Sequence, residues 1–378
     1  MSSIPKIRPT PFHARAASQN SFNRWTSRNG FTLAKDYGDA QAEALAARTS
    51  AVLIDISWRW RVAFEGAKAA ECLARLVTKN ANALIPGQSL KALWLNDGGA
   101  VRGAGVVARY ASDQFLVASA GTDAAWFGKA VRPFDVSLRD LTEQDGGLAI
   151  IGPYAEAILQ AAGLSGDLAP LNFRKLFWRG LDVTLSRWGE QDGFEIWCKA
   201  DDCFVLWDRL IRAGESFGIR AAGSDAADIL DIEMGVPRPD RDYRAAKDDF
   251  GRAPLPESLG LEGLIDEGHL GFNGRNASLD ARSAANFALV GVAIDSEIPA
   301  PFSPLSRSGR SVGKTLTSMH SPLLRRAIAL AHVEKSVAAV GEEFSVALPL
   351  SLDHSENRNV GGHVAALPFV TLPESEKG

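Results

Sequence analysis

Cysteine is scarce in this sequence of 378 residues, which contains only Cys72, Cys198 and Cys203. Three thiols cannot form the disulfide framework of a small secreted protein, and none has metal-ligand spacing, so a reducing, cytoplasmic environment is expected. Neither sign of charge dominates, because 41 basic residues stand against 45 acidic ones without a basic block. Nucleic acid is therefore not expected as a partner.

Long apolar runs are also missing, and the N-terminal stretch MSSIPKIRPTPFHARAA has no apolar core. Neither export nor a membrane span is expected from this pattern. Between Gly309 and Gly313 lie three residues where a phosphate-binding loop needs four, which favours a β-turn instead. Scattered histidines and the lack of a nucleophile elbow argue against a metal site and the usual hydrolase chemistries.

Helical and strand patterns alternate through the first 220 residues, after a polar arm at the N-terminus. Ala-, Glu- and Leu-rich stretches such as 39–48 and 67–76 favour helices, and apolar runs such as 52–56 and 60–64 favour strands. The order predicts a mixed α+β fold with antiparallel pairs. Its two halves have a similar rhythm, which indicates duplicated α+β units without a residue-level repeat.

The last third of the chain differs in composition and in the spacing of its apolar residues. Residues 236–262 are rich in proline, glycine and charge, as in a long functional excursion. From Phe287 onward, short alternating strands separated by turn residues predict a small β-barrel as the terminal domain. Residues 373–378 are expected to be a tail.

An arginine triplet within the excursion allows two interpretations. Arg238, Arg241 and Arg244 recur every third residue among aspartates, with Tyr243 beside them. They form either a solvated, self-paired charge run or a site for an anion, because a guanidinium matches a carboxylate bidentately. In the second case Tyr243 is a candidate proton donor.

A tryptophan pair is also open to two interpretations. On one strand, Trp58 and Trp60 would share a face, with Arg59 and Arg61 on the other. Core packing is one explanation for the pair. An aromatic wall around a planar substrate is the alternative.

Ten ordered motifs together resemble the aminomethyltransferase family, typified by the glycine-cleavage T-protein, from about Thr10 to Phe369. Each is weak alone, and their order makes the resemblance specific. They include EALAART at 43–49, LIDIS at 53–57, LVTKN at 76–80, LNDGG at 95–99, IIGP at 150–153, DGFEI at 192–196, EMGVP at 233–237, GKTLTS at 313–318 and LPF at 367–369.

This resemblance implies a folate-binding body at 1–278, made of two intertwined α+β subdomains, and a C-terminal β-barrel at 279–372. Tetrahydrofolate is the implied cofactor. Glu195 occupies the position of the family's pterin-binding carboxylate, which accepts two parallel N–H donors. Phe115 and Trp188 are further candidates for cofactor contacts.

The departures from the family pattern are informative. After Gly98-Gly99 the family usually carries paired aspartates, whereas residues 100–103 read Ala-Val-Arg-Gly. The family's next tyrosine is Phe115 here, and the loop at 187–191 is short. Ala227 and Asp231 stand where arginines are expected. An ordinary glycine-cleavage role with a lipoyl-protein partner is therefore disfavoured.

The favoured function is a tetrahydrofolate-dependent demethylase acting on a small methylated substrate, with a methoxyaromatic as the candidate class. Tyr243, Arg241 and Arg102 are the candidate catalytic residues, and Trp58, Trp60 and Arg238 the candidate substrate-binding residues. A lyase of the same fold that expels formaldehyde remains an alternative, as does an aminomethyltransferase. A non-enzymatic folate-binding accessory protein is disfavoured, because such proteins carry a cysteine motif that residues 237–270 lack.

Overall fold

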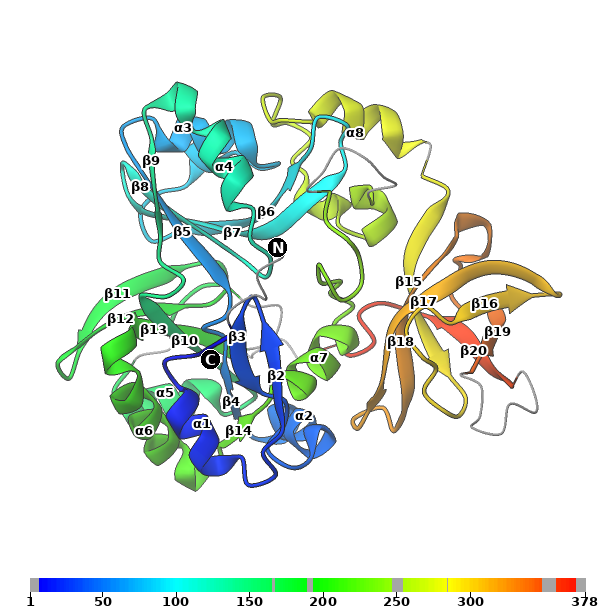
Figure 1. The fold of residues 1–378 in the computed structure, drawn as a ribbon, viewed down its shortest axis with the longest axis horizontal. Coiled ribbons are helices and arrows are strands. Elements are labelled where there is room, and N and C mark those ends of the chain that lie inside the picture. Colours follow the sequence, from blue (N-terminus) through cyan, green and yellow to red (C-terminus); the bar gives the residue numbers. More distant parts are fainter. Residues whose placement is uncertain are drawn as a thin grey trace, which may run out of the picture. The chain divides into compact units, whose positions relative to one another are not determined.

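The computed structural model describes residues 7–164, 167–188, 193–246, 254–283, 285–348 and 358–371. The expected tail, the loop residues 189–192 and part of the excursion lie outside these ranges. The chain divides into two compact units. Unit 1 comprises residues 1–94 and 103–227, and unit 2 comprises residues 95–102 and 228–378. Each is described by itself (Figure 1).

Unit 1 contains a six-stranded sheet whose strands are antiparallel except for the β4–β14 pair. Helices α5 (Ala155–Ala162) and α6 (Cys203–Gly214) pack on one face of it through an apolar core that includes Ile150, Ile196 and Trp207. The strand order is β11 (Phe173–Trp178), β12 (Leu181–Ser186), β13 (Gly193–Lys199), β10 (Asp145–Ile151), β4 (Val52–Asp55) and β14 (Arg220–Ala222).

A five-stranded sheet repeats this plan within unit 1. Its apolar core joins Phe64, Leu73 and Trp94 to Phe127 of α4 (Ala124–Ala130), with α3 (Ala69–Leu76) on the same face. The strand order is β6 (Ser89–Leu95), β7 (Val101–Ala111), β8 (Gln114–Ser119), β5 (Trp60–Glu65) and β9 (Ser137–Asp140). Two sheets, each with two helices on one face, confirm the predicted mixed α+β architecture.

The N-terminal residues correct one expectation, because the predicted polar arm carries regular structure. Strand β1 (Arg8–Pro9) comes first and helix α1 (His13–Gln19) follows it; β1 then joins β2 (Trp25–Arg28) and β3 (Phe31–Ala34) in a three-stranded sheet. Phe12 is fully buried, so an aromatic anchor holds this polar segment in place. Helix α2 (Ala40–Thr49) follows, capped by the Asp39 carboxylate as its composition predicts.

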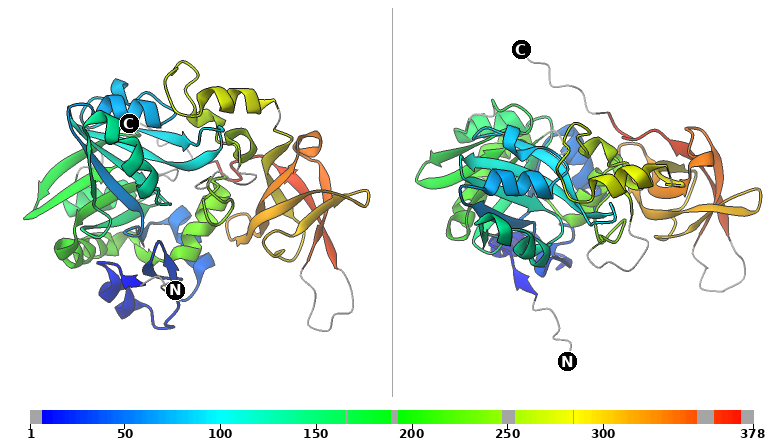
Figure 2. Two further views of the ribbon diagram at one scale, coloured as in Figure 1. Left: turned by 45° about the horizontal axis from the view of Figure 1, so that its top comes forward. Right: turned by 90° about the horizontal axis from the view of Figure 1, so that it is seen from above.

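Unit 2 contains the predicted barrel, shown in yellow to red in Figure 2. Val292, Leu305 and Val346 are buried among the side chains that fill it. The closed strand order is β15 (Phe287–Ile294), β18 (Arg326–Glu334), β17 (Arg310–Ser321), β16 (Pro304–Arg307), β19 (Glu343–Ala347) and β20 (Asn359–Ala365). Gly309, with φ of +75°, turns the chain between β16 and β17, which confirms the turn predicted there.

Helix α7 (Ser224–Glu233) and helix α8 (Arg275–Arg282) precede the barrel in the chain. Ile232 of α7 packs against Ile328 and Leu330. The Ser321 hydroxyl donates to Glu233 Oε1 at 2.6 Å. An apolar contact and a buried hydrogen bond therefore fasten the end of α7 to the barrel, which places residues 228–233 in unit 2.

The turn at 96–99 belongs to unit 2 as well. Gly99 has φ of +80°, and a Cβ atom on it would lie 2.4 Å from the backbone nitrogen of Ser278. Gly274 approaches the turn equally closely, since its own Cβ would lie 2.2 Å from the carbonyl oxygen of Asn96. Glycine is needed at both positions, because backbone meets backbone there.

Candidate functional site

Glu195 lies on β13, a central strand of the six-stranded sheet, opposite Ala149 on β10 and Ser186 on β12. Successive side chains of a strand point to opposite faces, so Glu195 and Trp197 share one face, away from the core beneath α5 and α6. Glu195 is only 5% exposed. A buried carboxylate needs hydrogen-bonding partners, and the same face supplies them.

Arg59 and Trp197 bind this carboxylate. Arg59 Nη1 pairs with Glu195 Oε1, and Trp197 Nε1 donates to Oε2 at 3.3 Å. Arg59 is itself one-third exposed. A carboxylate has about four acceptor positions, so these two donors leave capacity for further N–H donors. The structure thus presents Glu195 as an oriented acceptor.

Trp188 and Phe115 both lie in apolar clusters of unit 1. Trp188 packs edge-on against Phe173, with ring centroids 5.8 Å apart, and its Nε1 is buried without a hydrogen-bond partner among the described residues. Phe115 is fully buried beside Val117 and Phe127. An unsatisfied indole donor suits a ligand acceptor. Phe115 offers only an apolar surface.

The tryptophan pair corrects a second expectation. Strand β5 begins at Trp60, and Trp58 lies in the preceding turn, so the two rings do not share a strand face. Trp58 packs with Phe31 and Leu33, whereas Trp60 packs against Phe127 and donates from Nε1 to Asp140 at 3.3 Å. The expected shared strand face is therefore not formed, each ring packs in its own apolar surroundings, and a substrate contact by either ring stays a prediction.

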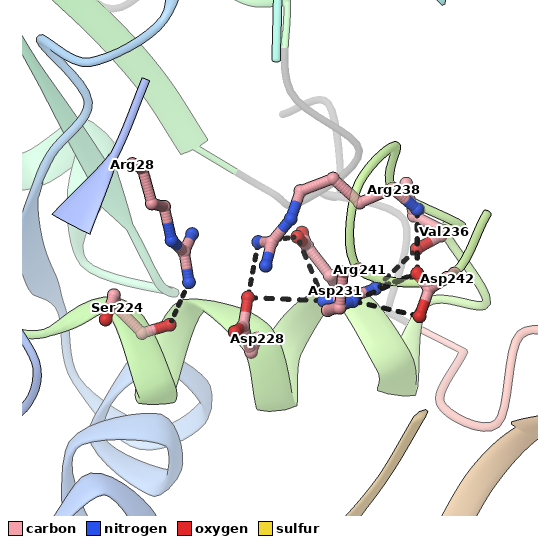
Figure 3. A network of polar contacts seen from close by, with 8 residues as sticks. All are labelled: Arg28, Ser224, Asp228, Asp231, Val236, Arg238, Arg241 and Asp242. Carbon is pink, nitrogen blue, oxygen red and sulfur yellow. Dashed lines mark hydrogen bonds and ion pairs between the residues drawn. The ribbon is translucent and has the colours of Figure 1, made fainter. Parts of the chain in front are cut away.

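In unit 2, Arg238 and Arg241 bind the carboxylates of α7. Asp228 and Asp231 are three residues apart and lie on one side of this helix (Figure 3). Arg238 Nη1 pairs with Asp228 and lies 3.5 Å from Asp231 Oδ2. Arg241 Nη1 lies 3.2 Å from Asp228 Oδ1.

Asp242 completes this arginine–aspartate cluster. Its side chain is fully buried and accepts from Arg241 Nη2 at 2.7 Å and from the Arg238 backbone N–H at 2.7 Å. Burial opposes the charge of Arg241, but Asp242 and the helix carboxylates outweigh it and raise the pKa of Arg241. Three acids surround two bases, so both arginine charges are balanced within the cluster, with one negative charge in excess. Arg244 is exposed beside it.

These contacts favour the self-paired interpretation of the triplet, although Arg238 and Arg241 are partly buried and not fully solvated. Binding of a substrate anion by Arg238 would require it to exchange a carboxylate partner. That role and a catalytic role for Arg241 stay predictions. Asp231, found where the family carries an arginine, supplies one of the acids that hold the pair.

Tyr243 and Arg102 lie in two different segments of unit 2 that are joined by hydrogen bonds. The Tyr243 hydroxyl is buried and has no hydrogen-bond partner among the described residues. Burial, and then Asp242 and Asp240, raise the pKa of Tyr243, so the phenol keeps its proton. Arg102 Nη1 donates to the Ala246 carbonyl at 3.1 Å, and Ala246 N donates to Val101 at 2.8 Å. Arg102 thus anchors the segment that carries Tyr243.

Sequence spacing contains a signal for Trp197 but none for Arg59. Trp197 follows Glu195 by two residues, which places both on one face of any strand. Arg59 comes from the turn before β5, 136 residues away, and no local pattern links it to Glu195. The pairing of Asp228 with the arginines is also not evident from the sequence, because it depends on Asp228 lying on helix α7.

The described residues contain no cluster of His, Cys, Asp or Glu side chains that could hold a metal ion. Within the same part of the chain, no helix is both long and apolar enough to cross a membrane.

Comparisons with known proteins match nearly the whole chain. Residues 12–251 match the family described as GCVT N-terminal domain, and residues 288–354 match the glycine cleavage T-protein C-terminal barrel domain. Proteins named aminomethyltransferase from Bacillus cereus (strain B4264) and Bacillus anthracis are each 28% identical over 351 residues, covering 90% of this chain and 92% of theirs.

A solved structure gives the same answer for the fold. The glycine cleavage system aminomethyltransferase T from Bartonella henselae superposes with a TM-score of 0.85 at 24% identity. The alignment covers 96% of this chain and 98% of that one. The predicted combination of an α+β body with a C-terminal barrel is therefore confirmed.

Proposed function

The chain belongs to the glycine-cleavage T-protein family, and on this premise we propose that it is a demethylase that transfers a methyl group from a small methoxyaromatic substrate to tetrahydrofolate. The aminomethyltransferases of the family depend on tetrahydrofolate, which confirms the expected cofactor and a folate-dependent one-carbon enzyme. The demethylase specificity is our own inference, and so are a cytoplasmic location and a small-molecule substrate.

The residues after the turn at 96–99 carry this proposal. The family pattern has acids there, and transfer of an aminomethyl group uses a carboxylate near the amine. In this chain Arg102 occupies the stretch, buried and bonded to a backbone carbonyl. A guanidinium has no acceptor atom and keeps its proton in proteins, so it cannot take a proton from an amine. A methyl donor that has no amine does not require a carboxylate at this position.

The residues of unit 1 fit the cofactor. Glu195 is an oriented carboxylate for the N–H groups of a pterin, and Trp188 Nε1 is a buried donor without an acceptor among the described residues. When bound, tetrahydrofolate supplies a nucleophilic nitrogen, N5, that accepts the methyl group. Positioning of the reactants can lower such a barrier by up to about 7–11 kcal/mol.

Tyr243 is assigned as the proton donor. Tyr243 would give its proton to the ether oxygen as that oxygen loses its bond to the methyl carbon and leaves as a phenol. The methyl group would replace the N5 proton of bound tetrahydrofolate, and that proton would restore the Tyr243 phenol. Tyr243 holds its proton because burial raises its pKa. Arg102 is assigned a positioning role, since it binds the backbone three residues beyond Tyr243.

The second candidate is an aminomethyltransferase, which the names of the curated relatives favour. In that case a carboxylate from outside residues 100–103 must serve the amine, and a lipoyl carrier protein would be the partner. A formaldehyde-releasing lyase is the third candidate. Its only supporting observation is that residues 100–103 lack the carboxylate of the family pattern.

One experiment separates the three. The purified enzyme is incubated with a panel of methoxyaromatics, with and without tetrahydrofolate, and 5-methyltetrahydrofolate and the phenol are quantified by mass spectrometry. Equimolar formation of both, only with tetrahydrofolate, is the expected result. Turnover that ignores tetrahydrofolate and releases formaldehyde would support the lyase. Activity only with an aminomethylated lipoyl carrier would support the aminomethyltransferase.

A further inference from the structure

A cavity of about 480 Å³ lies within unit 1, where the five-stranded sheet meets the six-stranded sheet. Strands of both sheets line it, including β5, β8, β11 and β12. Its volume lies within the range of about 300–1,000 Å³ that is typical of small-molecule sites. We call it the inter-sheet cavity. Neither Glu195 nor Trp188 lines it.

An ion-pair chain forms one part of the lining. Arg61 Nη1 lies 2.7 Å from Asp145 Oδ2, and Lys199 Nζ lies 2.7 Å from Asp145 Oδ1. The guanidinium of Arg61 also stacks on Trp197, 4.0 Å from the ring centroid. Arg61 is 4% exposed, yet its Nε has no hydrogen-bond partner among the described residues. A buried donor beside a cavity suits an acceptor on a ligand.

Lys175 gives the cavity a positive charge that is not in an ion pair with any described residue. Four basic and three acidic residues line it, which leaves one net positive charge. Arg61, Lys199 and Arg139 each pair with a carboxylate. Lys175 instead lies over the ring of Tyr110, with its Nζ 4.6 Å from the centroid. Its charge is available to an anion.

Tyr110 adds a polar atom to the same wall. Its hydroxyl is buried and makes no hydrogen bond of normal geometry within the part of the chain that the structure describes. Burial raises the pKa of Tyr110, while the charge of Arg61 and the Thr184 hydroxyl act in the opposite direction. The phenol therefore keeps its proton and is a further donor for an anionic ligand.

The remaining surface is apolar and aromatic. Leu116, Leu141, Leu176 and Val183 contribute aliphatic atoms, and Phe177 stands at the lining with 77% of its surface exposed. The Phe177 ring can stack on the ring of an aromatic ligand. The cavity thus combines an apolar surface for a ring with donors for one negative charge.

We propose that the inter-sheet cavity binds a small aromatic carboxylate, with its carboxylate toward Lys175 and Arg61 and its ring against Phe177. This site is distinct from that assigned to tetrahydrofolate and does not depend on the proposed reaction. Trp197 lies between the two, because its ring lines the cavity while its Nε1 donates to Glu195.

Calorimetry on the full-length protein tests the proposal with benzoate as the probe. Benzamide, of equal shape but neutral, and inorganic phosphate, an anion without a ring, are the comparison ligands. Benzoate should bind at least tenfold more tightly than either. Equal affinity for benzamide or for phosphate would overturn the proposal, and so would no binding of benzoate.

Variants locate the site. Lys175→Gln and Phe177→Ala each alter an exposed side chain and should weaken benzoate binding at least tenfold without lowering the thermal midpoint. Lys129→Gln, an exposed lysine on α4, is the matched control and should bind like the wild type. Unchanged affinity in both cavity variants would contradict the proposal.

A titration with saturating tetrahydrofolate separates this site from the cofactor site. Benzoate affinity should stay within threefold of its value without tetrahydrofolate. Loss of benzoate binding under these conditions would mean that the probe occupies the cofactor site, and the inter-sheet proposal would fail while the proposed function would stand.

Discussion

Two clusters of arginine and carboxylate, one in each unit, differ in how completely they are neutralised. Glu195 in unit 1 has one arginine and one indole donor, and that arginine is one-third exposed. In unit 2, Arg238 and Arg241 are enclosed by three aspartates. The same residue types thus form a carboxylate with free acceptor capacity in unit 1 (the open cluster) and a fully paired structural cluster in unit 2 (the closed cluster). Counting partners therefore distinguishes a binding group from a structural one.

Replacing Arg241 tests the closed cluster and has the largest expected effect. Arg241→Met leaves the fully buried Asp242 carboxylate without its cation. Breaking a buried ion pair by removing one partner costs about 3–5 kcal/mol of unfolding free energy. Urea unfolding followed by circular dichroism measures the loss. Arg244→Met, an exposed neighbour, is the control, and equal stability of the two variants would show that the cluster does not hold the segment.

Replacing Glu195 tests the open cluster. Glu195→Gln keeps the shape but removes the charge, and hydrogen bonds to charged groups are worth about 1.5–3 kcal/mol. The Kd for tetrahydrofolate should therefore rise about 10- to 150-fold by calorimetry. Glu71→Gln, at an exposed site on α3, should bind normally. Unaltered affinity in the Glu195 variant would show that this carboxylate does not hold the pterin.

Replacing Tyr243 has the smallest expected effect on stability. The hydroxyl has no partner, so Tyr243→Phe should change the unfolding free energy by less than about 1 kcal/mol. Loss of a general acid should nevertheless lower demethylation at least about 100-fold. Because burial raises the pKa of Tyr243, the donor form persists on the alkaline side, and wild-type turnover should show no fall from this group between pH 7 and about 10. Normal turnover by the variant would remove Tyr243 from the mechanism.

The architecture was largely predictable, because it follows from local patterns. Alternating apolar residues from Phe287 onward predict the strands that form the barrel, and Asp39 marks the start of α2. The polar stretch before α2 was the exception. Its helix and hairpin depend on the burial of Phe12, a contact that sequence spacing does not reveal.

The site was less predictable, because its contacts join distant segments. Glu195 follows from a motif, yet its partner Arg59 comes from a turn in another part of unit 1. The prediction that Trp58 and Trp60 share a strand face was wrong, because the strand starts at Trp60, two residues after Trp58. The inter-sheet cavity needs the packing of two sheets, and no single segment encodes it.

The turn at 96–99 also has a consequence for biosynthesis. Its glycines meet the backbone at 274–278 within unit 2, and Asn273 donates to the Leu95 carbonyl at 3.0 Å. The ribosome synthesises the turn more than a hundred residues before residues 273–278. During that time the turn cannot make these backbone contacts. A gene fragment that encodes the barrel alone would lack the turn. Unit 2 is therefore completed only when the whole polypeptide has been synthesised.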